Sequence, residues 1–388
     1  MTEKNIKSEA GILSANIAVI VTFLYLISVA MIFLVTGDKK LVILQTIWYL
    51  LGVMVIILMR FISISYFEKY AVWLYGLGIL MLAVVLIFGK EVNGAKRWLD
   101  LGVVSLQTSE FMKIFFILYL AKIIAHHREK KQQGQELLLF VKVFLVLIVP
   151  LVFIFKQPDL GTAIVFLLIT CGMLFIGGLS KKIIAVAVIS GSAIMGGLTY
   201  LIIFQRQILL DIGMKNYQFQ RIDTWIDGSA VDADSAYNVE QAVLAVGSGG
   251  YVGNGMDPQV YVPERHTDFI FSMIGETTGL IGSAILIILY FFLMYYFIRT
   301  CFLTKTLYHT YVITGILIMM SYHMFQNIAM NIGLMPVTGI PLPFISYGGS
   351  AILANMLSIA IILSIQHQHY SSVFGSDPSF EKKEALTN

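Results

Sequence analysis

Residues 262–276 read VPERHTDFIFSMIGE, and they gather charges that are rare in the other long runs of this chain. The segment is polar as far as Asp268 and then apolar towards Arg299. A carboxylate at such a boundary meets water on one side and lipid on the other, so Asp268 could act on a molecule anchored in lipid. Asp268 or Thr267 could equally cap the following helix by accepting bonds from its unpaired N–H groups. Both interpretations stay open from the local pattern.

The composition indicates a membrane protein. Hydrophobic residues make up 58% of the chain and charged residues 13%, with a mean hydropathy of +0.82. Soluble domains carry about 25% charged residues, so a soluble globule is excluded. The net charge of +3 is too small to suggest a nucleic-acid partner, and two cysteines cannot form a disulfide framework. The first apolar run, Ala15 to Val35, lacks a small-residue cleavage site, so no cleavable signal peptide is expected.

Apolar runs long enough to cross about 30 Å of hydrocarbon as helices recur along the chain. They predict an all-α polytopic membrane protein, a single domain over 1–388 with about ten transmembrane helices, near 15–36, 41–60, 70–89, 105–125, 138–156, 160–179, 182–204, 269–299, 307–332 and 350–368. An even number of spans places both termini on one side. Lysine and arginine are more frequent in the loops on that side, so 1–14 is predicted to be a cytoplasmic N-terminus and 369–388 a cytoplasmic tail.

Two loops on the predicted external side are unusual. Residues 205–268 form a large extracellular loop between spans seven and eight, and its apolar residues recur at spacings typical of short amphipathic helices. Residues 333–350 are rich in proline and glycine but begin with apolar residues, so this segment is predicted to dip back into the protein. Irregular backbone at that depth is tolerated only beside protein or a water-filled cavity.

Charges inside predicted spans are costly and are therefore functional candidates. Glu110 and Lys113 are three residues apart, so on a helix they share a face and can neutralise each other. They are either a structural ion pair or a site where Lys113 binds a phosphate-bearing head group and Glu110 positions the lysine.

Other polar residues of the predicted spans have two explanations each. His323, Asn327 and Asn331 are spaced four apart and form one stripe, which is either interhelical bonding or part of a site. Glu276 lies two helical turns beyond Asp268, which allows a paired acid and base. A buried, hydrogen-bonded glutamate is the simpler explanation.

The loop before the fourth predicted span carries Lys96, Arg97 and Trp98. Two cations beside an indole suit a sugar or diphosphate head group, through charge-assisted bonds and stacking. These cations lie on the predicted external side, against the usual charge bias, and an anionic ligand would explain them. The chain has no zinc-ligand spacing, nucleotide-binding glycine loop or metalloprotease motif, so no metal site is predicted.

Six motifs, in order along the chain, resemble those of the SEDS family of shape, elongation, division and sporulation proteins. They are Asn93-Gly-Ala-Lys-Arg-Trp98, Ser109-Glu-Phe-Met-Lys113, Gln157-Pro-Asp-Leu-Gly-Thr162, Gly247-Ser-Gly-Gly250, Pro263-Glu-Arg-His-Thr-Asp-Phe-Ile-Phe271 and Gly339-Ile-Pro-Leu-Pro-Phe-Ile-Ser-Tyr-Gly-Gly349. The resemblance runs from residue 15 to residue 368. The fifth motif and the loop around Pro336 look closer to the rod-shape protein RodA than to the division protein FtsW.

The resemblance implies a function. It implies a peptidoglycan glycosyltransferase that polymerises lipid II, the undecaprenyl-diphosphate-linked disaccharide-peptide, at the outer face of a bacterial cytoplasmic membrane, for cell elongation and shape. It also implies a class B penicillin-binding protein as the partner that crosslinks the strands. The family's essential acidic residue maps onto Asp268, its tryptophan onto Trp98, and its charged pair onto Glu110 and Lys113. Thr277 stands where the family commonly has a second glutamate.

The resulting hypothesis makes Asp268 the catalytic general base, which takes a proton from the acceptor sugar while the lipid diphosphate leaves. The predicted substrate-binding residues are Lys96, Arg97, Trp98, Glu110, Lys113, Arg265, His266 and Glu276. Cations among them would offset the charge that grows on the diphosphate. The sequence requires no cofactor, although a divalent cation could share that task.

Two other functions remain as alternatives. A transporter that flips lipid II would need a hydrophilic route from face to face, whereas the inner halves of the predicted spans are nearly all apolar. A non-catalytic scaffold would dock cell-wall enzymes through its spans and would leave Asp268 replaceable.

Overall fold

The computed structural model describes residues 3–92, 95–100, 102, 105–130, 136–178, 181–211, 216–226, 233–263, 265–304 and 306–373. The elements in those ranges are α1 (Glu3–Thr36), α2 (Lys39–Met59), α3 (Ile64–Phe88), β1 (Lys90–Val92), β2 (Ala95–Asp100), β3 (Ser105–Gln107), α4 (Thr108–Glu129), α5 (Glu136–Lys156), α6 (Leu160–Ile176), α7 (Lys181–Phe204), α8 (Arg206–Asp211), α9 (Asn216–Ile226), α10 (Ala233–Ser248), α11 (Ile270–Leu303), α12 (Leu307–Asn331) and α13 (Gly349–Val373). Most of the predicted tail, from residue 374 on, lies outside the described residues, as do Asn93, Gly94 and Glu264 of the motifs.

A helix is present at every predicted span, which confirms the polytopic helical class. Of the described helices, seven are long and apolar enough to cross a membrane: α1 from Gly11 on, α2, α3, α5, α11, α12 and α13. The short apolar helix α6 has 17 residues, and α4 carries the buried charges Glu110 and Lys113. The number of ten spans therefore stays a prediction.

Side-chain caps explain where two of the helices begin. The hydroxyl of Ser63 accepts a hydrogen bond from the Ser65 amide (3.3 Å), so α3 starts well before the predicted residue 70. The carboxylate of Asp159 accepts a bond from the Thr162 amide (3.1 Å) and begins α6. Both caps satisfy amides that a helix leaves unpaired at its first turn.

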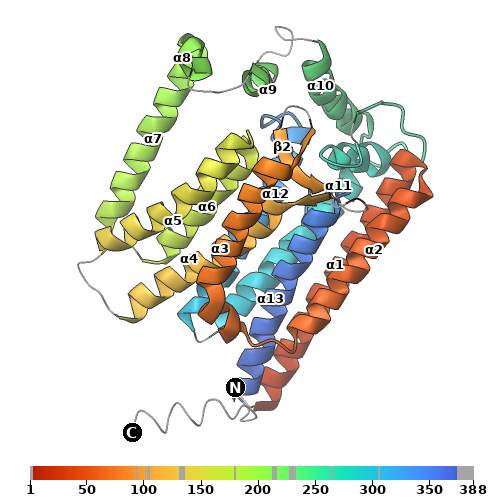
Figure 1. Cartoon of the computed structure of the whole chain (residues 1–388). Coiled ribbons are helices and arrows are strands. Elements are labelled where there is room, and N and C mark those ends of the chain that lie inside the picture. Colours follow the sequence, from red (N-terminus) through yellow and green to blue (C-terminus); the bar gives the residue numbers. More distant parts are fainter. Residues whose placement is uncertain are drawn as a thin grey trace, which may run out of the picture.

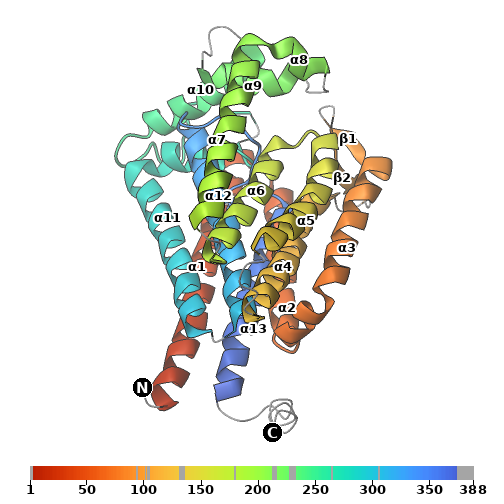
Figure 2. The same cartoon turned by 90° about the vertical axis from the view of Figure 1, so that its left-hand side faces the viewer.

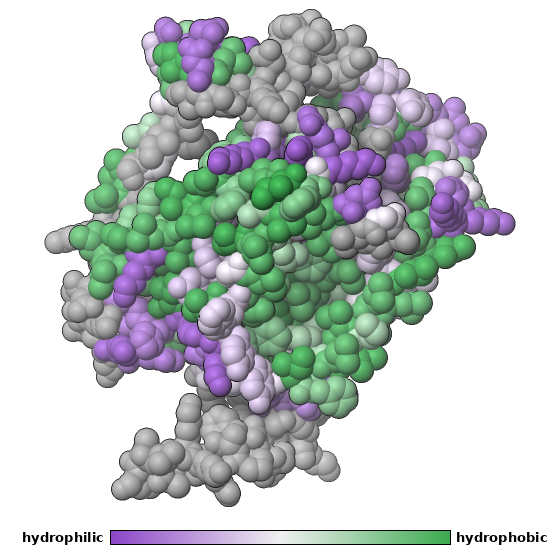
Figure 3. Space-filling model, viewed as in Figure 1, coloured by the Kyte–Doolittle hydropathy of each residue, from purple (hydrophilic) through white to green (hydrophobic). Residues whose placement is uncertain are grey.

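The helices form one bundle with two polar ends. α1 begins and α13 ends at the same end of it, at the bottom of Figure 1, and α8, α9 and α10 lie across the opposite end (Figures 1 and 2). We call this opposite end the outer end. Hydrophobic residues cover the middle of the surface and hydrophilic residues gather towards both ends (Figure 3). Large apolar side chains such as Leu50, Trp73 and Phe292 are exposed on the helices, as expected for helices that face lipid.

The first turns of α11 form a short half-helix that a break at Gly279 separates from the rest. Gly279 has φ 64° and ψ −160°, which is outside the helical region and is accessible to glycine. The half-helix, Ile270 to Thr278, is buried at almost every position, whereas Leu280 and Ile281 beyond the break are exposed. The predicted span 269–299 is thus two helical pieces joined at the outer end.

Two small features at the outer end complete the fold around the site. The strands β1, β2 and β3 form an antiparallel sheet, in that order, directly before α4, and no strand was expected from the sequence here. The segment between α12 and α13 does dip into the bundle as predicted, since Phe344, Ile345 and Ser346 are all buried. Phe344 has φ 64°, an unfavourable value for a side chain of this size.

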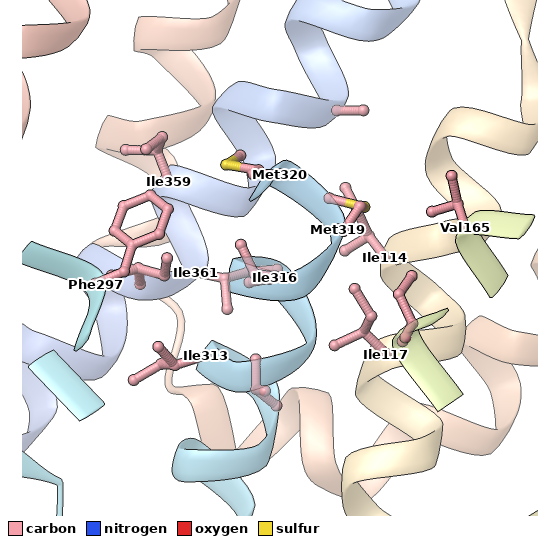
Figure 4. Close-up of a cluster of buried hydrophobic side chains, with 14 of the residues drawn as sticks. Ile114, Ile117, Val165, Phe297, Ile313, Ile316, Met319, Met320, Ile359 and Ile361 are labelled. Carbon is pink, nitrogen blue, oxygen red and sulfur yellow. The ribbon is translucent and has the colours of Figure 1, made fainter. Parts of the chain in front are cut away.

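The core is apolar in the middle of the bundle. Side chains of α4, α6, α11, α12 and α13 converge there, with Ile114, Ile117, Ile316, Met319 and Ile361 among them (Figure 4). Buried charged side chains such as Glu110, Lys113 and Glu276 lie instead towards the outer end, whereas the buried polar residues nearer the inner end, such as Thr300, Thr314 and Gln366, are uncharged. Among the described residues, these buried charges are therefore confined to the outer part of the bundle.

Candidate functional site

Asp268 lies at the outer end, directly before the half-helix of α11, and is half-buried. Its backbone carbonyl accepts hydrogen bonds from Asn327 Nδ2 (2.8 Å) and Asn331 Nδ2 (3.1 Å) of α12. The N-cap position of α11 belongs to Phe269, whose side chain makes no capping bond, and Asn331 Oδ1 accepts from the Ser272 amide instead (3.1 Å). Two asparagines of α12 thus fix the backbone at Asp268, which confirms the interhelical role of the polar stripe.

The loop that dips between α12 and α13 packs against the residues before Asp268. Ser346 Oγ donates to the Thr267 carbonyl (2.6 Å), and the Tyr347 amide donates to the His266 carbonyl (2.9 Å). The rings of His266 and Tyr347 are 5.8 Å apart between centroids. A Cβ atom added to Gly339 would lie 3.4 Å from Asp268 Oδ2, so the carboxylate faces a position that has no side chain.

Tyr347 contributes an uncharged phenol to this site. Burial raises the pKa of its phenol above the usual range, and the negative charge of Asp38 raises the pKa further. The phenol therefore keeps its proton at neutral pH and adds no charge beside His266.

Glu276 is completely buried, and its carboxylate is occupied by protein donors. Oε1 accepts from the backbone amides of Gln259 (2.7 Å) and Val260 (2.8 Å), and Oε2 pairs with the guanidinium of Arg265. The predicted substrate contacts Arg265 and Glu276 are therefore each other's partner. Together they fix the course of the chain from residue 259 to the segment that carries Asp268. The Nε atom of Arg265 is buried and has no hydrogen-bond partner among the described residues.

Glu110 and Lys113 form a buried ion pair, as their spacing predicts. Lys113 Nζ lies 2.8 Å from Glu110 Oε1 and 3.1 Å from His323 Nε2. All three side chains are buried. An ammonium has only donors, so His323 must accept at Nε2 and carry its proton on the other ring nitrogen. Because His323 and Asn327 are one turn apart on α12, about 6 Å along the axis, this cluster lies just inward of the contacts that hold Asp268.

Arg97 does not point its charge at an open site. Nε donates to the Gln157 carbonyl (3.0 Å), another guanidinium nitrogen donates to the Pro158 carbonyl, and Nη1 lies 3.7 Å from Asp159 Oδ2. The arginine therefore joins strand β2 to the turn between α5 and α6. Its neighbours Lys96 and Trp98 are half-buried on the same strand, in register with Glu91 and with Lys90.

With this geometry established, comparisons with known proteins identify the family. The family model for FtsW, RodA and SpoVE, described as cell cycle protein, matches residues 10–371. The chain belongs to this family.

Relatives of the FtsW/RodA/SpoVE family match over most of their length. The peptidoglycan glycosyltransferase MrdB of Escherichia coli is 34% identical over 324 residues, which are 82% of this chain and 83% of that protein. The probable peptidoglycan glycosyltransferase FtsW of Thiomicrospira cyclica is 32% identical over 331 residues, 82% of this chain and 81% of that protein. The expected SEDS membership is confirmed. Relatives of both names match at similar identity, so closeness to RodA rather than FtsW stays a prediction.

Solved structures show the same fold at lower identity. A chain from a peptidoglycan synthase complex that coordinates polymerization and crosslinking superposes with a TM-score of 0.77, at 24% identity, and covers 92% of this chain and 97% of that one. The rod shape determining protein RodA of Thermus thermophilus gives a TM-score of 0.67, also at 24% identity, with 91% and 96% covered. The polytopic membrane fold is therefore that of the FtsW/RodA/SpoVE family.

Several residues that hold the dipping loop were not predicted from the sequence. Tyr49 and Tyr290 donate to the Phe344 and Pro343 carbonyls, and Ser28 Oγ donates to the Ile345 carbonyl (2.7 Å). Gln45 is completely buried and donates to Ser28 and to Ser346. A polar residue inside an apolar run, such as Gln45, could have indicated these contacts, because a buried polar side chain needs a hydrogen-bond partner.

Proposed function

We propose that this chain is a peptidoglycan glycosyltransferase that polymerises lipid II at the outer face of a bacterial cytoplasmic membrane. The reaction class is supported by the curated relatives, which are named for that activity. The proposal places both termini in the cytoplasm and assigns a class B penicillin-binding protein as the partner that crosslinks the product. A role in cell elongation and shape belongs to the proposal as well.

The position of Asp268 carries this proposal. A half-buried carboxylate at the outer end, whose backbone is fixed by Asn327 and Asn331, is suited to be a general base for a substrate with its tail in lipid. Asp268 removes the proton from the 4-hydroxyl of the acceptor N-acetylglucosamine. The freed oxygen attacks C1 of the donor N-acetylmuramic acid, the bond from C1 to the diphosphate oxygen breaks, and the configuration inverts.

Lys113 is the cation that best suits the leaving diphosphate. Its ammonium has three N–H donors, and Glu110 and His323 take two of them among the described residues. The third donor remains for a phosphate oxygen that enters from the outer end. Lys96, half-buried on β2, is a second candidate, whereas the guanidinium of Arg97 is occupied by two carbonyls and Asp159.

The inner core argues against a transport route for the head group. Inward of Lys113 and His323, the described bundle is filled by the apolar cluster of Ile114, Ile316 and Met319 (Figure 4). A diphosphate-sugar could cross that layer only by losing its hydration without gaining polar partners, which is costly.

The deciding experiment uses the purified protein with fluorescent lipid II, with and without its partner transpeptidase. Asp268→Asn keeps the size of the side chain but removes the base, and it should lower polymerisation by about 10²- to 10⁴-fold. Asp257→Asn, at an exposed aspartate of the same loop, is the matched control and should polymerise like the native protein. Polymer from Asp268→Asn at the native rate would remove Asp268 from the mechanism. Movement of lipid II across the bilayer without polymer would identify a transporter.

A further inference from the structure

The loop between α10 and residue 257 carries large apolar side chains on its surface. Tyr251 and Val252 are each 76% exposed, and Met256 is 84% exposed. Residues 249–256 read GGYVGNGM and contain no charge; the first charge after them is Asp257. No neighbouring part of the described chain covers these apolar side chains.

Backbone hydrogen bonds join this loop to the break in α11. They run from the Leu280 amide to the Gly250 carbonyl (2.9 Å), from Ile281 to Tyr251 (3.2 Å), from Asn254 to the Glu276 carbonyl (2.8 Å) and from Gly255 to Thr277 (3.1 Å). Gly253 also donates to the Gly249 carbonyl (2.8 Å). A Cβ atom on Gly253 would collide with the Thr277 carbonyl, so the loop can approach this closely only because it has no side chain there. The loop thus satisfies groups that the break in α11 would leave unpaired.

The break in α11 lies below the outer end of α1. Thr277 Oγ1 contacts Met31 Sδ of α1 at 3.6 Å. Met31 precedes Thr36, the last residue of an apolar span, by five residues, so it lies about 7–8 Å below the end of that helix. The loop is bonded to Thr277 and, beyond it, to Ile281, so it lies level with the last turns of that apolar helix rather than beyond its end.

The side chains around the loop continue the surface that faces lipid. Leu280 is 59% exposed and Ile281 55% exposed, immediately beyond the break on α11. Their amides bond the carbonyls of Gly250 and Tyr251, which makes the apolar surface of the loop and that of α11 neighbours. Pairing of loop backbone groups inside the protein is what a lipid environment demands, whereas a loop in water has no need of it.

We propose that residues 250–256 form a membrane-inserted turn whose apolar side chains, Tyr251, Val252 and Met256, enter the outer leaflet. The occupant of this surface is lipid, because the turn is uncharged, internally bonded and continuous with the lipid-facing side of α11. Tyrosine is enriched at such interfaces, where its ring is apolar and its hydroxyl reaches the head groups. A functional consequence follows only if the proposed function holds: the turn is bonded to the half-helix that begins after Asp268, so it fixes the depth of that carboxylate relative to the lipid surface.

Spin labels test the insertion without using the activity. The chain has two cysteines, so replacing Cys171 and Cys301 by alanine gives a background for single labels in the full-length protein. A nitroxide at Val252→Cys is measured in vesicles of phosphatidylethanolamine and phosphatidylglycerol by its collisions with oxygen and with a water-soluble nickel chelate. Asp257→Cys is the control in water, and Phe292→Cys, exposed on α11, is the control in lipid.

Insertion predicts that the ratio of oxygen to nickel collisions at Val252 is several-fold higher than at Asp257 and close to that at Phe292. Tyr251→Cys and Met256→Cys are second sites, in case one label disturbs the fold, and they should behave in the same way. A ratio at all three sites equal to that at Asp257 would overturn the proposal. Protection from nickel only after the partner transpeptidase is added would also overturn it, because the surface would then be a protein interface.

Discussion

Two carboxylates eight residues apart, Asp268 and Glu276, have opposite surroundings. Glu276 has no exposed surface, and its oxygens are taken by the amides of Gln259 and Val260 and by Arg265. Asp268 keeps part of its surface exposed, and its Oδ2 faces the bare Cα of Gly339. The sequence places both acids on one short segment, and the packing gives them different environments.

This difference shows how a charge inside a membrane protein is used. A buried carboxylate whose oxygens all accept bonds from protein donors can stabilise the fold, because its charge is compensated. A carboxylate that acts as a base must meet its substrate, and so it has to keep an open side. Glu276 thus holds the loop that leads to Asp268 through its contacts with Gln259, Val260 and Arg265, and its role as a substrate contact stays a prediction.

The largest expected effect on stability comes from Glu276→Gln. The change leaves the buried guanidinium of Arg265 without its counter-charge, which costs about 3–5 kcal/mol for a buried pair. Thermal unfolding of the purified protein should show a clear loss of stability, whereas Asp268→Asn should unfold like the native protein. Equal losses for the two variants would contradict the division of roles between the two carboxylates.

An intermediate effect is expected from Gly339→Ala. Gly339 has φ +74°, so alanine costs about 1 kcal/mol in backbone strain, and its Cβ would also contact Asp268 Oδ2. Gly37→Ala, between α1 and α2, is the matched control, because Gly37 has φ +61° and an added Cβ would meet nothing within 4 Å. Both variants should lose similar stability, but only Gly339→Ala should slow lipid II polymerisation. Equal rates for the two would mean that the space beside Asp268 is irrelevant to its task.

The smallest effect is expected from Thr277→Val. Thr277 follows Glu276 directly, is buried, and bonds the Met273 carbonyl (2.8 Å) and Met31 Sδ. Valine keeps the shape and loses only these bonds, which are worth about 0.6 kcal/mol within a membrane. Thermal unfolding should therefore change little. A loss of stability as large as that of Glu276→Gln would show that any change in the half-helix is destabilising, whether or not it removes a buried charge.

Much of the fold could be predicted because it depends on length and local pattern. The predicted span 307–332 differs from α12, Leu307–Asn331, by one residue, since an apolar run long enough for the bilayer has few other structures open to it. The break at Gly279 could not be predicted in the same way. It lies inside an apolar run, and its backbone partners come from residues 250–255, in a different segment.

The sequence by itself determined the helical membrane architecture and the Glu110–Lys113 pair, because both follow from short-range geometry along one helix. Only the tertiary structure decided that Arg97 joins β2 to the α5–α6 turn. It also decided that the carboxylate of Glu276 accepts from Arg265 and two amides, and that Asn327 and Asn331 hold the backbone at Asp268. These contacts link residues of separate elements or loops. Their partners are chosen by how the helices pack, and no periodicity within a single segment encodes that choice.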